Sequence, residues 1–295
     1  MDYVIETDAL TKRYGVKVAV NRMNVHVARG DIYGLIGKNG AGKTTLMKLL
    51  LGLTLPNSGG MRLFGSDDLN SARKKIGSLI EAPALFKNET AFENMKRFAI
   101  LAKTSDDEIK RLLDLVGLGD TGSKKAGAFS LGMKQRLGIA IALLGDPEIL
   151  ILDEPINGLD PAGIKEVRDM IVELNAKGIT FMISSHILDE LGKIATTYGI
   201  ANDGYLEEIS AEELKARCKS SLKIVTGDGA KAAEVIKEQF PYLTLTLEGN
   251  IVKITSEVEN SAVLNKALVN ADVAVYSITD ESVGFEDYFI QRLGK

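Results

Sequence analysis

The chain has little cysteine and no long apolar run, and each shortage excludes a class of protein. Its 295 residues include one cysteine, Cys218, so a fold stabilised by internal disulfides is excluded and a reducing, cytosolic setting fits. No apolar stretch approaches the roughly 18 residues of a membrane-spanning helix, and the N-terminus lacks a basic-then-apolar leader. The sequence therefore predicts a cytoplasmic protein that would reach the inner face of a membrane, as a peripheral subunit, through a partner.

The chain also has little excess of charge of either sign. The 36 basic and 40 acidic residues leave a net charge of −4, which creates no overall field that would attract nucleic acid or anionic lipid. Hydrophobic residues make up 45% and charged residues 26% of the chain, which is ordinary for a soluble globular protein of one large or two smaller domains. We therefore expect no nucleic-acid partner.

A complete G-x-x-x-x-G-K-[ST] phosphate-binding motif is present, between a strand-like apolar run and a helical one. Glycines let successive backbone N–H groups point at one phosphate chain, and the following helix adds its positive N-terminal end. Lys43 is expected to reach the β- and γ-phosphates, and Thr44 to ligate Mg²⁺. The predicted nucleoside triphosphate site consists of Gly37, Lys38, Asn39, Gly40, Ala41, Gly42, Lys43, Thr44 and Thr45.

The region around this motif predicts an α/β core with two additions. Alternating apolar residues near the N-terminus, including a strand at 23–27, predict a small antiparallel sheet. Apolar residues at helical spacing predict helices at 91–102 and 106–115. Runs of consecutive apolar residues at 149–152 and 179–183 are typical of strands covered on both faces of a parallel sheet. Further helices are expected to open near residue 130 and to span 162–176.

The pattern changes beyond about residue 210. Strands and helices are expected to follow in the order strand, helix, strand, strand, helix, strand, which is the split βαβ pattern of ferredoxin-like domains. No phosphate loop, metal cluster or acid pair occurs in this part of the sequence. We therefore predict an ATPase domain at 1–209 and an accessory domain at 210–295, for contacts or regulation. The expected elements of the accessory domain are 222–226, 230–240, 243–247, 251–255, 262–269, 273–278 and a last helix at 285–293.

Functional side chains follow the two buried strands. Asp153 ends the first strand, where a carboxylate is costly unless it coordinates something, so we expect it to act on Mg²⁺ directly or through an intermediate ligand. Glu154 comes next and, since side chains alternate along a strand, is expected to face another way and to accept a proton from an attacking water. His186 ends the second strand, at the sheet edge where α/β proteins place functional residues.

The order of these motifs resembles that of ATP-binding cassette (ABC) proteins. The segment 129–136 resembles the signature of the family, and it precedes Asp153-Glu154, the segment 157–160 and His186 in the family's order. The resemblance covers about residues 3–209 and implies a RecA-like core, an antiparallel β subdomain, a helical subdomain and ATP hydrolysis. It further implies that Tyr14 stacks on adenine, that Asp160 lies in the loop touching the opposite subunit, and that His186 hydrogen-bonds the γ-phosphate.

In that family the ATP site is composite. Ser130 and Gly132, at the start of a helix, are by this resemblance directed at the γ-phosphate bound by the phosphate loop of a second subunit. A helix N-terminus with a hydroxyl is an anion-binding end, which agrees with the role. The resemblance therefore implies a second ATP-binding subunit, either another copy of the chain or a related one, and separate transmembrane permease subunits.

Two departures from the family pattern concern contacts to the nucleotide. Phe129, Leu131 and Met133 replace the usual leucine, glycine and glutamine of the signature, while the serine and the second glycine remain. Glu81 stands where the family usually has a glutamine that ligates Mg²⁺, so it would strengthen metal binding while repelling the γ-phosphate. Both features resemble the bacterial subunits that export bacitracin and lantibiotics.

Other classes of function fit less well. Translation-type cassette ATPases usually carry two cassettes in one chain, and one phosphate loop is present here. Repair-type members insert a long coiled coil between phosphate loop and signature, whereas the gap here is about 90 residues without sustained heptads. A P-loop kinase or GTPase would leave the signature unexplained. The leading hypothesis is the ATPase subunit of a peptide-antibiotic exporter.

Overall fold

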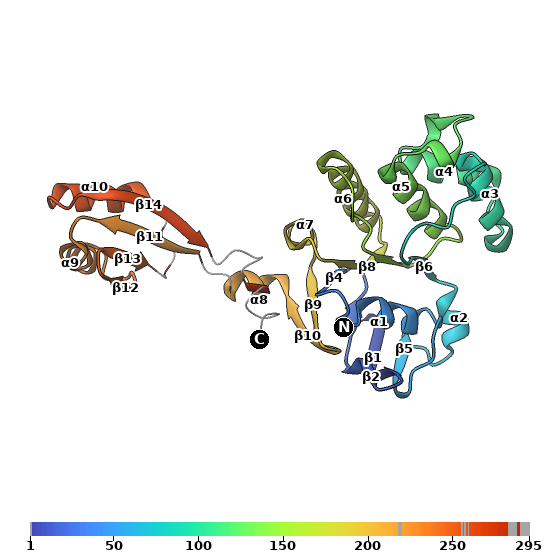
Figure 1. Cartoon of the computed structure of the whole chain (residues 1–295), viewed down its shortest axis with the longest axis horizontal. Helices are drawn as coiled ribbons and strands as arrows, with labels where there is room; N and C mark the ends of the chain where they lie inside the picture. The colour runs from blue at the N-terminus through green and yellow to red at the C-terminus, as the bar shows by residue number, and fades with distance from the viewer. Residues whose placement is uncertain are drawn as a thin grey trace. The chain divides into compact units, whose positions relative to one another are not determined.

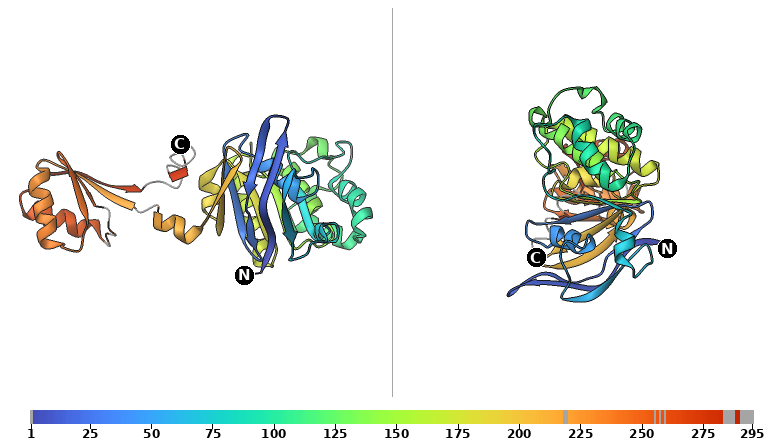
Figure 2. Two further views of the ribbon diagram at one scale, coloured as in Figure 1. Left: turned by 90° about the horizontal axis from the view of Figure 1, so that it is seen from below. Right: turned by 90° about the vertical axis from the view of Figure 1, so that its right-hand side faces the viewer.

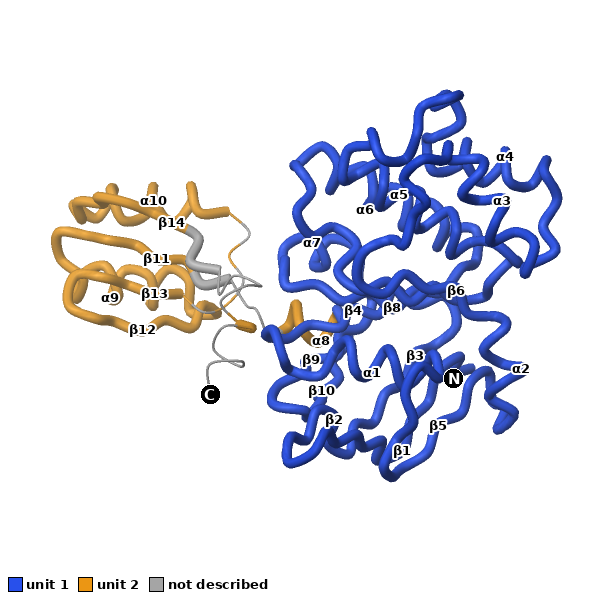
Figure 3. The backbone as a smooth tube through the Cα atoms, turned by 45° about the vertical axis from the view of Figure 1, so that its right-hand side comes forward, with its two compact units in different colours: residues 1–211 blue, residues 212–295 orange. Residues whose placement is uncertain are grey.

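A six-stranded sheet carries the phosphate loop, and its strands are parallel except at one edge. The computed structural model describes residues 2–217, 220–254, 256, 258, 260–282 and 288–289. The chain divides into two compact units, residues 1–211 and 212–295, two residues beyond the predicted division (Figure 3). In the first unit the order of the large sheet is β10 (Tyr205–Ser210), β9 (Thr197–Asn202), β4 (Ile32–Gly37), β8 (Thr180–Ser185), β7 (Ile149–Asp153) and β6 (Ile76–Leu79).

The two apolar runs form the predicted buried strands. Every residue of β4, β7 and β8 is buried, because helices or the second sheet cover both faces. The five parallel strands run side by side from β9 to β6, and β10 pairs antiparallel with β9 at the edge. The carboxyl ends of β4, β7 and β8 therefore meet at one sheet edge, where the phosphate loop begins.

A four-stranded antiparallel sheet lies below the large sheet (Figures 1 and 2). Its long strand β1 pairs with the other three, and the strands are β1 (Tyr3–Tyr14), β2 (Lys17–Met23), β3 (His26–Ala28) and β5 (Ser58–Leu63). Helix α1 (Lys43–Leu50) lies between the two sheets. Its apolar residues Leu46, Met47, Leu49 and Leu50 share one side of the helix and are all fully buried, whereas the other side, with Thr44, Thr45 and Lys48, is partly exposed.

The strand expected at 23–27 is wrong. Strand β2 ends at Met23 and β3 starts at His26, and between them side chains supply hydrogen bonds beside a backbone bond from the Thr7 N–H to the Val25 carbonyl oxygen at 3.0 Å. Asn24 Oδ1 accepts a hydrogen bond from the backbone N–H of Ala9 at 2.7 Å, and the backbone N–H of Val25 donates to Thr7 Oγ1 at 2.8 Å. A side chain that bonds the backbone competes with the strand ladder, and apolar alternation alone does not reveal it.

Several helices lie on the face of the large sheet that points away from the antiparallel sheet. They form the helical region and connect it to the core. The predicted helices at 91–102 and 106–115 are confirmed as α3 (Ala91–Ala102) and α4 (Asp106–Leu115). Hydroxyl or carboxylate caps start them, including a reciprocal capping box between Thr90 and Glu93. Other helices are α2 (Leu69–Arg73), α5 (Leu131–Ala142), α6 (Pro161–Ala176) and α7 (Leu188–Gly192), with short 3₁₀ turns at Gly119–Thr121 and Ala126–Ala128.

The described residues of the second unit form an antiparallel sheet, two helices that pack against it and most of a third helix at its start. Its sheet order is β12-β13-β11-β14, and one apolar cluster joins β11 and β13 to α9 and α10. The ferredoxin-like assignment stays a prediction, and both Cys218 and most of the helix expected at 285–293 lie outside the described residues. The elements are α8 (Ala211–Arg217), which begins at the division between the units, β11 (Ser220–Thr226), α9 (Gly229–Gln239), β12 (Leu245–Glu248), β13 (Ile251–Ile254), α10 (Ser261–Asn270) and β14 (Val275–Ser282). Among the described helices, none combines the length and apolar character needed to cross a bilayer.

Candidate functional site

The phosphate loop connects β4 to α1 in a tight turn that requires glycine. Gly42 caps α1 with φ of 104°, and a Cβ placed on it would lie 2.1 Å from the carbonyl oxygen of Ala19 in β2. A side chain at this position would be strained and would collide with backbone, so only glycine lets the antiparallel sheet approach the loop. The N–H groups at the start of α1 are thereby left for a ligand.

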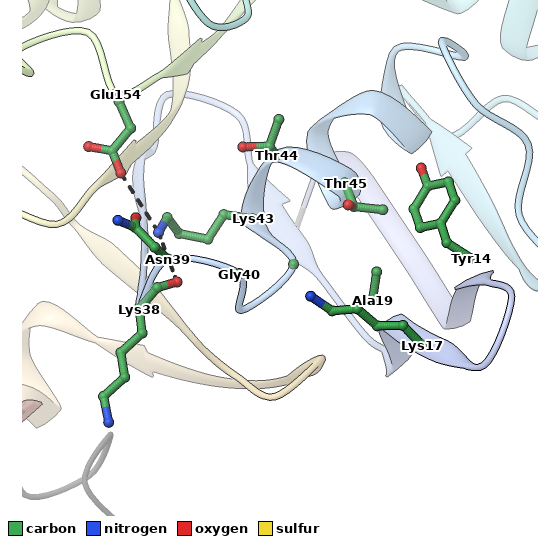
Figure 4. Close-up of a pocket in the computed structure, with 11 residues that line it drawn as sticks. Tyr14, Lys17, Ala19, Lys38, Asn39, Gly40, Lys43, Thr44, Thr45 and Glu154 are labelled. Carbon is green, nitrogen blue, oxygen red and sulfur yellow. Dashed lines mark hydrogen bonds and ion pairs between the residues drawn. The ribbon is translucent and has the colours of Figure 1, made fainter.

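The loop lines one side of a pocket (Figure 4). Opposite the loop, Tyr14 and Lys17 come from the antiparallel sheet, and Glu154 enters from the end of β7. Tyr14 is half exposed and has the Lys12 ammonium over its ring, 5.1 Å from the centroid, so the exposed part of the ring can still cover a flat group. The lining residues are Tyr14, Lys17, Ala19, Lys38, Asn39, Gly40, Gly42, Lys43, Thr44, Thr45 and Glu154. All but Lys17 and Ala19 were predicted.

Lys43 is a buried cation within this loop. Its side chain is 5% exposed, and its ammonium donates to the carbonyl oxygen of Gly37 at 2.6 Å. Glu154 Oε1 lies 3.7 Å from the same nitrogen. A buried charge needs such partners, so the ammonium is held at the mouth of the loop, facing the Glu154 carboxylate. Figure 4 shows the Lys38 side chain pointing away from this contact.

Asp153 is held between two hydroxyl groups. It is 4% exposed; its Oδ2 accepts a hydrogen bond from Thr44 Oγ1 at 2.8 Å, and its Oδ1 accepts one from Ser184 Oγ at 2.6 Å. The contacts tie the end of β7 to the first turn of α1 and to β8. Hydroxyl and carboxylate oxygens are the hard ligands that Mg²⁺ prefers, and Mg²⁺ usually takes one or two carboxylates, with waters and substrate phosphates completing the shell.

Glu154 and His186 form a second pair. His186 Nδ1 lies 2.7 Å from Glu154 Oε2, and because a carboxylate can only accept, the ring donates in this contact. Glu154 was expected to face another way than Asp153 because side chains alternate along a strand. That alternation does not set its direction. Strand β7 ends at Asp153, and Glu154 has φ of 50°, in the left-handed region. The turn is held by a hydrogen bond from the Glu154 backbone N–H to Ser184 Oγ at 2.9 Å.

Ser184 is a site residue that sequence reasoning missed. Its hydroxyl donates to Asp153 and accepts from the Glu154 backbone, so one buried side chain orients both acidic residues. The available signal was a hydroxyl residue at the carboxyl end of a buried strand, directly after the apolar run Phe181-Met182-Ile183. Lys17 was missed as well, because a lysine in an edge strand has no distinguishing pattern.

We predict that Ser184→Ala destabilises the protein. The substitution leaves a buried carboxylate oxygen and a backbone N–H without their partner, which costs about 1–3 kcal/mol in the free energy of unfolding. Chemical denaturation measures this, with Ser185→Ala as the matched control, because Ser185 bonds only the local backbone of Ile187. Equal losses in the two variants would contradict the role given to Ser184.

Eight predicted residues lie outside the pocket lining, namely Gly37, Ala41, Glu81, Ser130, Gly132, Asp153, Asp160 and His186. Ser130 caps α5 and accepts from the Met133 backbone N–H at 3.2 Å, and Gly132 lies in the first turn of that helix. Asp160 caps α6 and accepts from the Gly163 backbone N–H at 3.0 Å. Glu81 follows β6 and contacts Lys48 of α1, with Lys48 Nζ and Glu81 Oε1 2.8 Å apart. Of the remaining predicted residues, Ala41 is buried behind the loop.

The fold and this geometry define a P-loop nucleoside triphosphatase: a glycine turn at the start of α1, a buried lysine, and an aspartate–glutamate pair at the end of the neighbouring strand. The sequence profile of the family described as "ABC transporter" matches residues 20–157. The chain is 40% identical to the bacitracin transport ATP-binding protein BcrA of Enterococcus faecalis, over 100% of this chain and 97% of that protein. The chain therefore belongs to the ABC transporter ATP-binding family, whose members bind and hydrolyse ATP.

Other similarities agree. The chain is 42% identical to BcrA of Bacillus licheniformis, over 100% of this chain and 98% of that protein. It is 45% identical to the lantibiotic transport ATP-binding protein SrtF of Streptococcus pyogenes, over 68% of this chain and 88% of that protein. A solved structure of an ATP-binding subunit of an ABC transporter matches with a TM-score of 0.65 at 29% identity, covering 72% of this chain and 92% of that one. The predicted cassette fold is confirmed.

Proposed function

We propose that this protein is the ATP-hydrolysing subunit of an exporter of bacitracin-type peptide antibiotics. Its likeness to the bacitracin transport proteins extends over the whole chain, including the second unit, whereas the likeness to the lantibiotic transport protein covers 68% of it. This difference in coverage favours a bacitracin-like cargo over a lantibiotic one. The proteins named above act in transport, so a cassette ATPase of translation or DNA repair is not favoured.

The pocket supports specific roles for its residues. Tyr14 would cover the adenine, and the loop N–H groups with Lys43 would hold the phosphates. Thr44 and Asp153 would hold Mg²⁺, which supplies charge neutralisation at the β- and γ-phosphates. Among the described residues no cluster of three or more acidic, histidine or cysteine side chains could hold a metal alone, which agrees with a Mg²⁺ site completed by the nucleotide.

Glu154 and His186 would act on the attacking water. The carboxylate of Glu154 lies between the Lys43 ammonium and the His186 ring, so it is fixed at the phosphate end of the pocket. There it would accept a proton from the water, while His186 keeps it oriented through Nδ1 and would donate to the γ-phosphate from Nε2 when that nitrogen also carries a proton. This Lys43–Glu154–His186 arrangement is the observation that carries the catalytic proposal.

The site would be completed by a second ATP-binding subunit. Ser130, Gly132 and Asp160 stand at the N-termini of α5 and α6, outside the pocket of their own chain, and Ser130 and Asp160 cap these helices. We assign the Ser130 end of α5 to the γ-phosphate held by the partner's loop. Permease subunits would carry the cargo and hold the ATPase at the inner face of the membrane, and the second unit would serve contacts or regulation.

The cargo proposal is tested in cells. We expect that deleting the gene while leaving its permease partner in place increases sensitivity to bacitracin, and that the wild-type chain restores resistance while a Glu154→Gln chain does not. A lantibiotic panel run in parallel separates the two cargo classes. Unchanged sensitivity to both panels, with no polytopic membrane protein co-purifying with the chain, would contradict the proposal.

A further inference from the structure

We propose that Lys48, one helical turn from Thr44 on α1, is a positioning residue for the metal site and holds the carboxylate of Glu81 in competition with the Mg²⁺ of the bound nucleotide. This inference rests on the proposed Mg²⁺–ATP site and adds a residue to it. It also gives a role to the glutamate that stands where the family pattern has glutamine.

The position of Lys48 on α1 supports the first step. Thr44 and Lys48 are four residues apart in the same helix, so their side chains lie on one face, separated along the axis by about 6 Å. Thr44 Oγ1 donates to Asp153 Oδ2 at 2.8 Å. Lys48 therefore lies one helical turn from a side chain that holds the carboxylate of the predicted metal site.

The pairing of Glu81 supports the second step. Lys48 Nζ lies 2.8 Å from Glu81 Oε1, and this hydrogen bond lowers the pKa of Glu81, so the carboxylate is charged near neutral pH. Glu81 follows β6 with φ of 63°, a left-handed conformation that is unfavourable for a residue with a side chain. Within the described part of the chain, Lys48 is the side chain that Glu81 contacts.

The exposure of the Lys48–Glu81 ion pair indicates that Glu81 can exchange the ammonium for another cation. The Glu81 side chain is 67% exposed and that of Lys48 36%, and an exposed ion pair of this kind changes an equilibrium by about fivefold or less. A divalent cation held by Thr44 and Asp153 can therefore compete with the ammonium for the carboxylate. While Glu81 remains paired, the pair has no net charge, so the repulsion expected between Glu81 and the γ-phosphate is offset.

The competition predicts the direction in which a substitution of Lys48 changes the affinity for Mg²⁺. Lys48→Met removes the competing ammonium and releases Glu81, so the Mg²⁺ concentration that half-saturates the nucleotide complex should fall by about twofold to fivefold. Removing any positive charge near the metal would also favour Mg²⁺ binding. A single variant cannot separate this general effect from the release of Glu81. The comparison must therefore be repeated where residue 81 has no charge.

A double-mutant cycle makes this separation. Mg²⁺ is titrated at fixed concentration of a fluorescent ATP analogue, with full-length wild type, Lys48→Met, Glu81→Gln and the double variant, and binding rather than turnover is measured. We expect Lys48→Met to lower the half-saturating Mg²⁺ in the wild-type background and to have a clearly smaller effect with Glu81→Gln. Lys48→Arg, which keeps the ion pair, should behave like the wild type.

Each outcome has a distinct meaning. An equal effect of Lys48→Met in both backgrounds, or no effect in either, overturns the inference while leaving the nucleotide site intact. A wild-type chain that binds the analogue without any dependence on Mg²⁺ contradicts the proposed metal site itself. Because Lys48 is partly exposed, Lys48→Gln serves as a second neutral variant if Lys48→Met fails to fold.

Discussion

Glu154→Gln is expected to reduce ATP turnover by about 10²–10⁴-fold, the usual contribution of a general base, while ATP binding survives. The amide has nearly the size of the carboxylate but cannot accept the proton of an attacking water. The turn that presents residue 154 is held through its backbone N–H by Ser184, so the substitution leaves that support in place. The loss should therefore be chemical and not a loss of fold.

The same variant should accumulate an ATP-bound dimer. If hydrolysis releases the two subunits, blocking it keeps the closed form, which light scattering detects as a doubled mass in the presence of ATP. Glu234→Gln makes the same chemical change at an exposed position of α9, and it should leave both turnover and mass unchanged. Turnover at the wild-type rate in Glu154→Gln would remove Glu154 from the role of base.

The sequence predictions succeeded where local signals agree with the tertiary fold. Helices α3 and α4 have the predicted bounds because capping residues, Thr90 and Ser105, start them and apolar spacing continues them. The buried strands β7 and β8 were predictable because residues covered on both faces are apolar at consecutive positions. The phosphate loop needs both features, since its glycine turn is meaningful only between a buried strand and a helix.

The misses come from side chains that act across the fold. The strand predicted at 23–27 breaks because Asn24 bonds the backbone of another strand, and no local pattern encodes that contact. Ser184 and Lys48 gain their roles from residues 31 and 33 positions away, at Asp153 and Glu81. Glu154 lines the pocket, but a left-handed turn directs it there and strand alternation does not.

Gly132→Asp is expected to abolish hydrolysis without harming the fold of the chain, which makes it the sharpest test of the composite site. A Cβ at Gly132 would meet only Leu159 Cδ2, at 3.8 Å, which is ordinary contact. Residue 132 lies in the first turn of α5, where a carboxylate is favourable to the helix dipole. In the proposed dimer, however, it would face the partner's γ-phosphate, replacing attraction by repulsion and reducing turnover by about 10²-fold or more.

Mixing two inactive chains then decides whether the site is shared between subunits. Gly132→Asp damages the helix end but keeps the phosphate loop, while Lys43→Met damages the loop but keeps the helix end. In a mixed dimer the loop of the first chain meets the intact helix end of the second, so one of its two sites is whole. With random pairing, hydrolysis should return to about a quarter of the wild-type rate, whereas each variant alone stays inactive. If the mixture stays as inactive as its components while mass measurements show mixed dimers, the two halves of the site do not come from different chains.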